Sequence, residues 1–291
     1  MKSELLIAAA LVVAPLLHLE AAMYARFEDD GGVSHFASLT GGTLDVLDAA
    51  PWAGGKPTGE RVAIEKVRLL PPSAPRNIIG LAGAYVRNGM RPARDTIRWF
   101  AKSPSAAAAS GEDVPVPQGL DTLKAEVELV AIIGRRCRNL TPEQARAAIF
   151  GFCTGTEIFG FAQDFYQTHR ETPPSSDTML EAGLKLGDKM APFGPLVHTS
   201  VDWRELSTTL RVIAADGKVS AEYHDSTKGM LHTPAEAVSQ LSQIMTLEPG
   251  DVIFTGSTKS FIVHAGDTVE TEVAGLGRLR NRIVPPPSGT P

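Results

Sequence analysis

The sequence has little cysteine, few aromatic residues and no run of positive charge. Cys137 and Cys153 are its two cysteines. Two thiols fit neither a disulfide framework nor a cysteine-ligated zinc site, so we interpret both as buried side chains. The formal net charge is −5, and the sequence shows no basic stripe or nucleic-acid motif. Nucleic acid is therefore not expected as a partner.

Long apolar runs are also missing, except near the start. An apolar segment from Leu5 to Leu19 is interrupted by one proline and one histidine and is followed by small residues. This order is typical of a secretory signal peptide, and it is too short and too broken for a stable membrane span. The alternative is that residues 1–22 are spurious and the chain starts at Met23. The first interpretation implies a secreted or periplasmic protein, and the second a cytoplasmic one.

The remaining composition is that of an ordinary globular protein. Hydrophobic residues make up 43% and charged residues 21% of the 291 positions. Short apolar stretches separated by glycine and proline turns predict many strands, with few strand–helix–strand alternations. We therefore predict a β-rich α+β fold with a small N-terminal β domain at 23–72, a larger domain at 73–284 and a disordered tail at 285–291.

Two helices are predicted from their start signals. Thr141 precedes a proline and then Glu143 and Gln144, which suit the first turn of a helix running to Ile149. Thr233 again precedes a proline and has a glutamate three positions later, which predicts a capped helix to Leu247. A threonine cap followed by proline at the first helical position is a recognised start of a helix.

One apolar, β-branched stretch carries two carboxylates at alternate positions. On a strand, Glu126 and Glu128 point to the same face, and we expect Val127, Leu129 and Ile132 to crowd around them. Two carboxylates held beside a core repel each other and resist ionisation, and a cation between them would relieve both effects. The alternative is an edge strand whose glutamates face water.

A third carboxylate could complete a metal site. Glu157 lies in Thr154-Gly-Thr-Glu-Ile158, which follows the first predicted helix. Three oxygen ligands without cysteine or clustered histidine favour Mg²⁺ or Mn²⁺ over Zn²⁺.

Six stretches in one order resemble the fumarylacetoacetate hydrolase (FAH) family, whose members act on 2-oxo and β-diketo acids. The resemblance covers about residues 23 to 284. The stretches are Ile78–Tyr85, Phe100–Ser105, Glu126–Val130, Gly151–Ile158, Lys185–Asp188 with Pro192–Pro195, and Leu247–Gly256.

The resemblance implies a mixed-β barrel-like roll, a homodimer, and Mg²⁺ or Mn²⁺ held at the positions of Glu126, Glu128 and Glu157. The family usually has aspartate at the third position. The resemblance also implies that Lys185 lies near the substrate and can donate or accept a proton.

Four further residues in the matching stretches are expected to bind substrate: Tyr85, Lys102, Thr255 and Gly256. Thr255 and Gly256 match the start of a substrate loop that the family continues as Thr-Pro. Here the loop continues as Ser257-Thr258.

The sequence departs from the family where hydrolytic members carry a water-activating His–Glu pair. The corresponding positions are Asn88 and Arg91. Neither an amide nor a guanidinium group can act as a general base near neutral pH. Phe161 falls near the place of an arginine that the family usually has after the third ligand.

Other acid–base groups must then be considered. With Lys185, we take Asp164 and His264 as the catalytic candidates, because His264 follows the Thr255 loop. His169 and His224 are further candidates, although a lone histidine is more often structural or exposed.

Three functions remain open. The first is a metal-dependent C–C hydrolase or decarboxylase (a lyase) acting on a 2-oxo or β-diketo acid. The second is a hydratase or keto–enol isomerase working through the same enolate, which the missing pair favours. The third is a non-catalytic binding protein on this fold, which the altered substrate loop favours.

Overall fold

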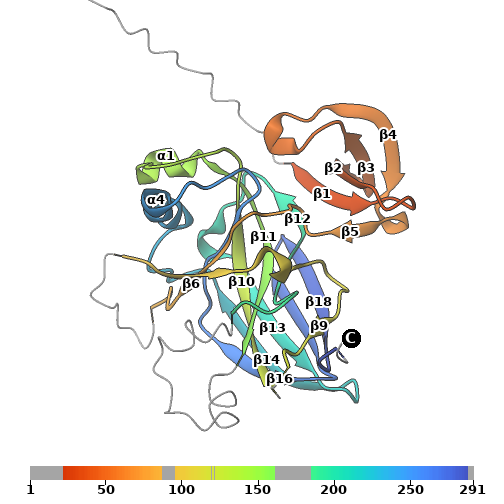
Figure 1. The fold of residues 1–291 in the computed structure, drawn as a ribbon, viewed down its shortest axis with the longest axis vertical. Coiled ribbons are helices and arrows are strands. Elements are labelled where there is room, and N and C mark those ends of the chain that lie inside the picture. The colour runs from red at the N-terminus through yellow and green to blue at the C-terminus, as the bar shows by residue number, and fades with distance from the viewer. Residues whose placement is uncertain (1–21, 87–95, 119, 121, 161–184, 288–291) are drawn as a thin grey trace, which may run out of the picture.

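The computed structural model of the chain describes residues 22–86, 96–118, 120, 122–160 and 185–287 (Figure 1). Strands dominate this part of the chain, and its α-helices are α1 and α4. The predicted β-rich α+β class is therefore confirmed. Among the described residues, no helix is long and apolar enough to cross a membrane.

The strands of the N-terminal unit are β1 Met23–Glu28, β2 Ser34–Thr40, β3 Thr43–Leu47, β4 Pro57–Ala63 and β5 Arg68–Leu70. The next elements are β6 Ile78–Ala82, β7 Arg98–Lys102, β8 Ala107–Ala108, β9 Val114–Pro115, β10 Thr122–Ile133, α1 Pro142–Arg146, β11 Ile149–Gly160 and β12 Ala191–His198. The last are β13 Ser207–Ile213, β14 Val219–Ser226, α4 Pro234–Ile244, β15 Val252–Phe254, β16 Ser260–His264, β17 Thr268–Val273 and β18 Gly277–Val284.

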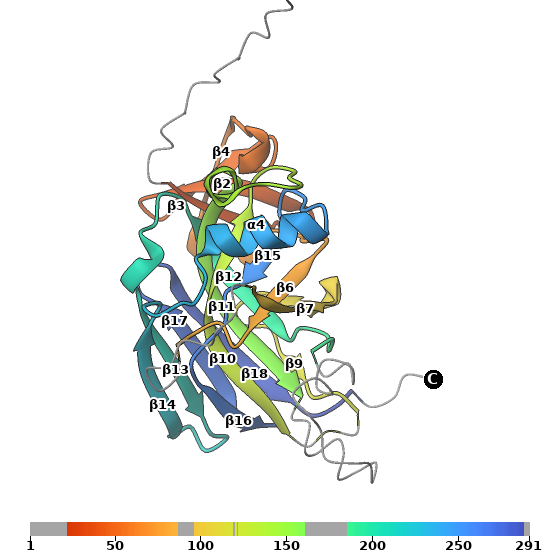
Figure 2. The same ribbon diagram turned by 90° about the vertical axis from the view of Figure 1, so that its left-hand side faces the viewer.

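The described strands form two sheets. The larger has the order β4-β3-β2-β1-β12-β11-β10-β15-β6-β7, with β5, β8 and β16 paired alongside, and the smaller has the order β14-β13-β17-β18-β9. The N-terminal unit joins the larger sheet where β1 pairs with β12. Figure 2 shows the two long strands β10 and β11 beside the layer that contains β13, β17 and β18.

Both helices begin as the sequence predicts and end earlier. Thr141 and Thr233 each form a capping box. The first helix stops at Arg146 because Ile149 already pairs with Ile133 in the sheet. The second stops at Ile244 because Leu247 pairs with Cys137 outside the helix. Strand pairing with a distant partner thus shortens each helix by about one turn.

The main core lies between the two sheets. Alternate residues of β10 point into it, and they include Leu123, Val127 and Leu129, which pack with Leu210 and Val269 of the second sheet. This placement corrects one expectation, because Val127 and Leu129 lie on the opposite face of β10 from Glu126 and Glu128 rather than around them.

The glutamate face of β10 has different apolar neighbours. Val130 and Ile132 continue this face into a second cluster with Phe193 and Phe254. β10 pairs with β11 along one edge and with β15 and β16 along the other. The alternative that this is an edge strand with glutamates facing water is therefore wrong.

The larger sheet curls strongly around the glutamate face. β7 is four strands away from β11 in the sheet order, which is about 19 Å in a flat sheet. Nevertheless, Lys102 Nζ of β7 lies 3.0 Å from Glu157 Oε1 of β11. A side chain cannot span a flat sheet of this width, so the contact requires a rolled shape, as the family resemblance implies.

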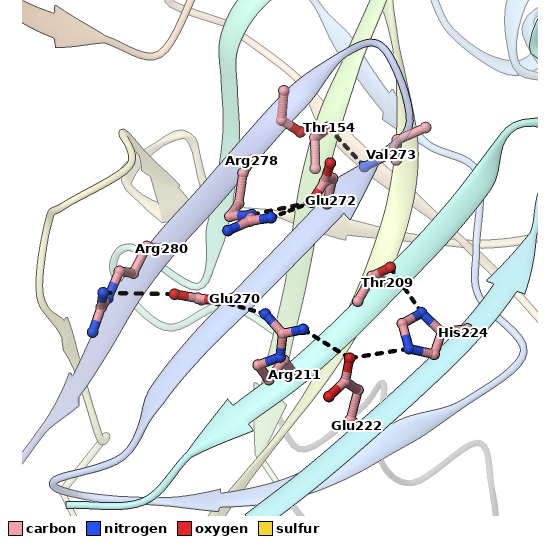
Figure 3. Close-up of polar contacts among 11 residues, drawn as sticks. Thr154, Thr209, Arg211, Glu222, His224, Glu270, Glu272, Val273, Arg278 and Arg280 are labelled. Atoms are coloured by element: carbon pink, nitrogen blue, oxygen red, sulfur yellow. Dashed lines mark hydrogen bonds and ion pairs between the residues drawn. The ribbon is translucent and has the colours of Figure 1, made fainter. Parts of the chain in front are cut away.

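The outward face of the second sheet is polar (Figure 3). Arg211 pairs with Glu222 at 2.7 Å and with Glu270 at 3.2 Å, and Arg278 pairs with Glu272 at 2.8 Å. Such surface pairs each contribute about 0–1 kcal/mol to stability. The charges on this face largely satisfy one another.

Candidate functional site

The candidate site lies where one edge of β10 stops pairing with strand β16 and starts pairing with strand β15. Residues Thr122–Glu126 pair with β16, and Val130–Ile132 pair with β15. The loop between β15 and β16 crosses the gap, and Thr255 donates to the Leu129 carbonyl from its amide at 3.1 Å and from its hydroxyl at 2.9 Å. The loop thereby reaches the glutamate face.

The three predicted carboxylates occur on adjoining strands. Glu126 is directly opposite Glu157, and Glu128 is opposite Gly155, in the antiparallel register of β10 and β11. Directly opposite residues share a face of a sheet, so the three side chains rise from the same side. Glu128 and Glu157 are 1% and 0% exposed, whereas Glu126 is half-buried.

Gly155 leaves room for this face to pack closely. A Cβ atom at this position would lie 2.3 Å from Val130 Cγ2 and 2.7 Å from the Phe254 ring. The position directly opposite Glu128 therefore has to lack a side chain.

Two lysines converge on one carboxylate oxygen. Lys102 Nζ and Lys185 Nζ each lie 3.0 Å from Glu157 Oε1, and Lys102 also donates to the Ile158 carbonyl at 2.8 Å. The Lys185 ammonium lies 3.6 Å from the ring centroid of Phe159 and 4.2 Å from that of Phe100. The aromatic rings and the carboxylate together hold this charge at the site.

Burial and charge perturb the titration of these groups. Burial, followed by the negative charges of Glu157 and Glu126, raises the pKa of Glu128 well above its ordinary value. Burial lowers the pKa of Lys102, and the neighbouring Glu157 opposes that shift. Perturbed groups of this kind gather at functional sites more often than elsewhere.

The cluster contains one unsatisfied atom. Glu157 Oε2 is buried and has no hydrogen-bond partner among the described residues. A buried carboxylate oxygen without a donor is costly, and a bound cation would satisfy it.

The donor set suits a divalent cation in its chemistry. Among the described residues the set offers carboxylate oxygens, which Mg²⁺ and Mn²⁺ prefer, and a cation would relieve the like-charge repulsion around Glu128. In the described ranges, however, no three His, Cys, Asp or Glu side chains are already arranged to hold a metal ion. Glu157 instead faces the two lysines.

Tyr85, Thr255 and Gly256 lie beside this cluster. The Gly256 amide donates to Glu128 Oε2 at 2.5 Å. Gly256 has a φ of +89°, and a Cβ there would meet Ala84 Cβ at 2.6 Å, so glycine is required. Burial, followed by the charges of Glu128 and Asp225, raises the pKa of the buried Tyr85 hydroxyl, which contacts Thr255.

The remaining candidates lie elsewhere. His264 is exposed, and its Nδ1 lies 3.7 Å from Asp267 Oδ2. It is opposite Thr122, four positions along β10 from Glu126, or about 13 Å. His224 is on the outward face of the second sheet, 3.0 Å from Glu222 (Figure 3).

Several predicted positions fall outside the described residues. They are Asn88, Arg91, Phe161, Asp164 and His169. Both cysteines are buried free thiols, and burial raises the pKa of each.

Sequence reasoning missed Asp225, which lies on the inward face of β14. Asp225 is opposite the buried Thr208, and Tyr223 is opposite the buried Leu210. Side chains alternate between the two faces of a strand, so a strand extended through residue 225 could have shown that Asp225 and Tyr223 share one side.

The fold is a rolled sheet that holds a buried cluster of carboxylates and lysines. Comparison with known proteins identifies the family that has this fold. The family described as "Fumarylacetoacetate (FAA) hydrolase C-terminal" matches residues 78–284, and "Rv2993c-like, N-terminal" matches residues 23–72. The chain belongs to the fumarylacetoacetate hydrolase family.

Two relatives illustrate the range of the family. The chain is 28% identical over 271 residues to protein Rv2993c of Mycobacterium tuberculosis, covering 89% of this chain and 97% of that protein. It is 29% identical over 192 residues to the 4-hydroxyphenylacetate degradation bifunctional isomerase/decarboxylase of Salmonella dublin, covering 64% of this chain and 41% of that protein.

Solved structures share the fold over nearly their whole length. The 5-carboxymethyl-2-hydroxymuconate delta-isomerase of Mycobacterium smegmatis is 26% identical, with a TM-score of 0.76, covering 90% of this chain and 99% of that one. The maleylpyruvate hydrolase of Sphingobium sp. SYK-6, in complex with manganese(II) and pyruvate, is 21% identical, with a TM-score of 0.67 and coverages of 91% and 99%. The latter likeness concerns the fold alone.

Proposed function

We propose that the chain is a divalent-metal-dependent enzyme that acts on a 2-oxo or β-diketo acid by C–C bond hydrolysis or decarboxylation. The observation that carries this proposal is the buried carboxylate set. Glu126, Glu128 and Glu157 rise from one face of two paired strands, and Glu157 Oε2 has no donor in the described part of the chain.

Glu126, Glu128 and Glu157 would hold Mg²⁺ or Mn²⁺. The ion would supply positive charge next to a 2-oxo group, where negative charge develops as the neighbouring C–C bond breaks. The likeness in fold to a hydrolase solved with manganese(II) and pyruvate is consistent with this choice.

The lysines and the loop would handle the substrate. Lys185, which contacts the rings of Phe100 and Phe159, would donate a proton or a hydrogen bond to a substrate oxygen next to the carboxylates. Buried Lys102 would add a second amine donor beside the same carboxylate oxygen, which suits a substrate group rich in acceptor oxygens. Tyr85 and the Thr255–Gly256 loop would form the adjoining wall.

A hydratase or isomerase is the second candidate. The positions of the family's His–Glu pair hold Asn88 and Arg91, which cannot activate water as general bases. One relative is an isomerase/decarboxylase and one similar structure is an isomerase, so isomerisation occurs among proteins similar to this chain.

Turnover with product identification tests the proposal. Purified protein would be supplied with Mg²⁺ or Mn²⁺, or with chelator, and offered oxaloacetate or an acylpyruvate. We expect metal-dependent release of pyruvate, with Glu128→Gln inactive and Glu222→Gln on the outward face unaffected. A product that retains every carbon would favour isomerisation or hydration. Absence of any metal-dependent turnover would leave the non-catalytic alternative.

The chain is also proposed to form a homodimer, as the family resemblance implies. Light scattering of the purified protein gives its mass directly, and a monomer at all concentrations would contradict the proposal.

A further inference from the structure

Three segments that are far apart in the sequence meet beside Tyr85. The Val86 amide donates to the Gly229 carbonyl at 3.0 Å, and the Leu231 amide donates to the Ala84 carbonyl at 2.8 Å. The segment after β14 therefore runs alongside the end of the β6 segment. The loop between β15 and β16 approaches the same place, where Gly256 packs against Ala84.

That loop is tied to the site at its start. Thr255 makes two hydrogen bonds to the Leu129 carbonyl, and the Gly256 amide donates to Glu128 Oε2. A displacement of the loop would therefore remove the donor that faces Glu128. The end of the loop needs its own attachment if this geometry is to persist.

Asp225 provides that attachment. Thr258, two residues after Gly256, donates its hydroxyl to Asp225 Oδ2. The same oxygen accepts a hydrogen bond from the Tyr223 hydroxyl at 3.1 Å, and Oδ1 accepts from the Ser226 amide at 2.8 Å. Within the described ranges, the donors to this half-buried carboxylate are all neutral, so it acts as an acceptor hub rather than as one half of an ion pair.

We propose that Asp225 is a positioning residue for the metal-dependent reaction. By holding Thr258, it fixes the loop so that the Gly256 amide faces Glu128 and Thr255 faces Tyr85. The catalytic part of this inference rests on the proposed function, whereas the structural part does not. Asp225 would not touch the substrate. It would raise the turnover number by preventing displacement of the loop, because moving a reacting group by about 1 Å can lower the rate on the order of 100-fold.

The structural part is tested by hydrogen exchange, which needs neither metal nor substrate. Exchange at the Gly256 amide should quicken by at least about tenfold in Asp225→Ala and in Thr258→Val, because both lose the same tether. The Val238 amide in α4 is the internal reference for overall destabilisation. Tyr223→Phe is the matched control, since it removes the other hydroxyl from the same oxygen and leaves Thr258 attached.

The catalytic part is tested with the metal-loaded enzyme on oxaloacetate or an acylpyruvate. Asp225→Ala should lower kcat by about 10-fold to 100-fold with little change in KM. The double variant Asp225→Ala/Thr258→Val should lose no more than either single variant, because both act through one contact. Asp225→Asn keeps one acceptor oxygen and should lie between wild type and Asp225→Ala.

Unchanged Gly256 exchange in both Asp225→Ala and Thr258→Val would overturn the proposal, as would kcat losses that add in the double variant. A wild-type protein without metal-dependent turnover would contradict the proposed function instead. The exchange measurement would still decide whether Asp225 holds the loop.

Discussion

At the scale of single residues, Lys185 is the side chain that we propose takes part most directly in the chemistry. Its ammonium contacts Glu157 Oε1 at 3.0 Å and lies against two aromatic rings, and its side chain is 11% exposed. With so little exposure, the surrounding groups hold the ammonium in position.

Replacing Lys185 by alanine should lower kcat by about 100-fold or more, the usual scale for a group that transfers a proton. The measurement is kcat with metal occupancy checked, and Lys218→Ala in an exposed turn is the matched control. An unchanged kcat at full occupancy would remove Lys185 from the mechanism and direct attention to Asp164.

At the scale of elements, the pairing of β10 with β11 creates the site. The register brings Glu126 opposite Glu157 and leaves Gly155 opposite Glu128. Val130 and Phe254 can pack against this position only because residue 155 has no side chain.

Gly155→Ala should therefore destabilise the protein by about 1–3 kcal/mol through overpacking. Urea unfolding measures the change, and Val130→Ala is the companion variant because Val130 is the nearest contact. The double variant should lose less stability than the two single variants added together. Strict additivity would contradict the proposed clash.

Much of this element-level architecture could be predicted from the sequence. Alternation placed Glu126 and Glu128 on one face, and the two threonine caps located both helix starts. The helix ends could not be predicted, because they depend on pairing of Ile149 and Leu247 with distant partners. Local propensity does not report such tertiary competition.

The content of the site was harder to predict. Nothing in the sequence indicates that Lys102 crosses a curled sheet to reach Glu157, because that contact depends on closure of the roll. The role of Asp225 likewise depends on a loop from a different sheet. His264 follows the substrate loop in sequence, yet strand β16 carries it away from the carboxylates.

At the scale of the whole molecule, His198 stands where the N-terminal unit meets the larger sheet. It is opposite both Met23 of β1 and Phe152 of β11. Burial lowers the pKa of this half-buried imidazole, and its Nε2 has no partner among the described residues. Its charged form is therefore disfavoured in the folded protein.

This pKa shift predicts a loss of stability in mild acid. Because the folded pKa lies below the unfolded value of about 6.5, the contribution is present above that pH and is lost as the pH falls below it. The urea concentration at the unfolding midpoint should decrease as the pH is lowered from about 7.5 to about 5.5. The decrease should be smaller in His198→Leu. Equal decreases in both proteins would contradict this assignment.

The central claim is that one buried carboxylate set binds a divalent cation, and calorimetry of Mn²⁺ or Mg²⁺ binding tests it most directly. Wild-type protein should bind one ion, and Glu128→Gln, which keeps the shape of the side chain but removes its charge, should bind none under the same conditions. Glu222→Gln, a surface carboxylate of the second sheet, should bind as wild type does. Equal affinities of wild type and Glu128→Gln would contradict the account.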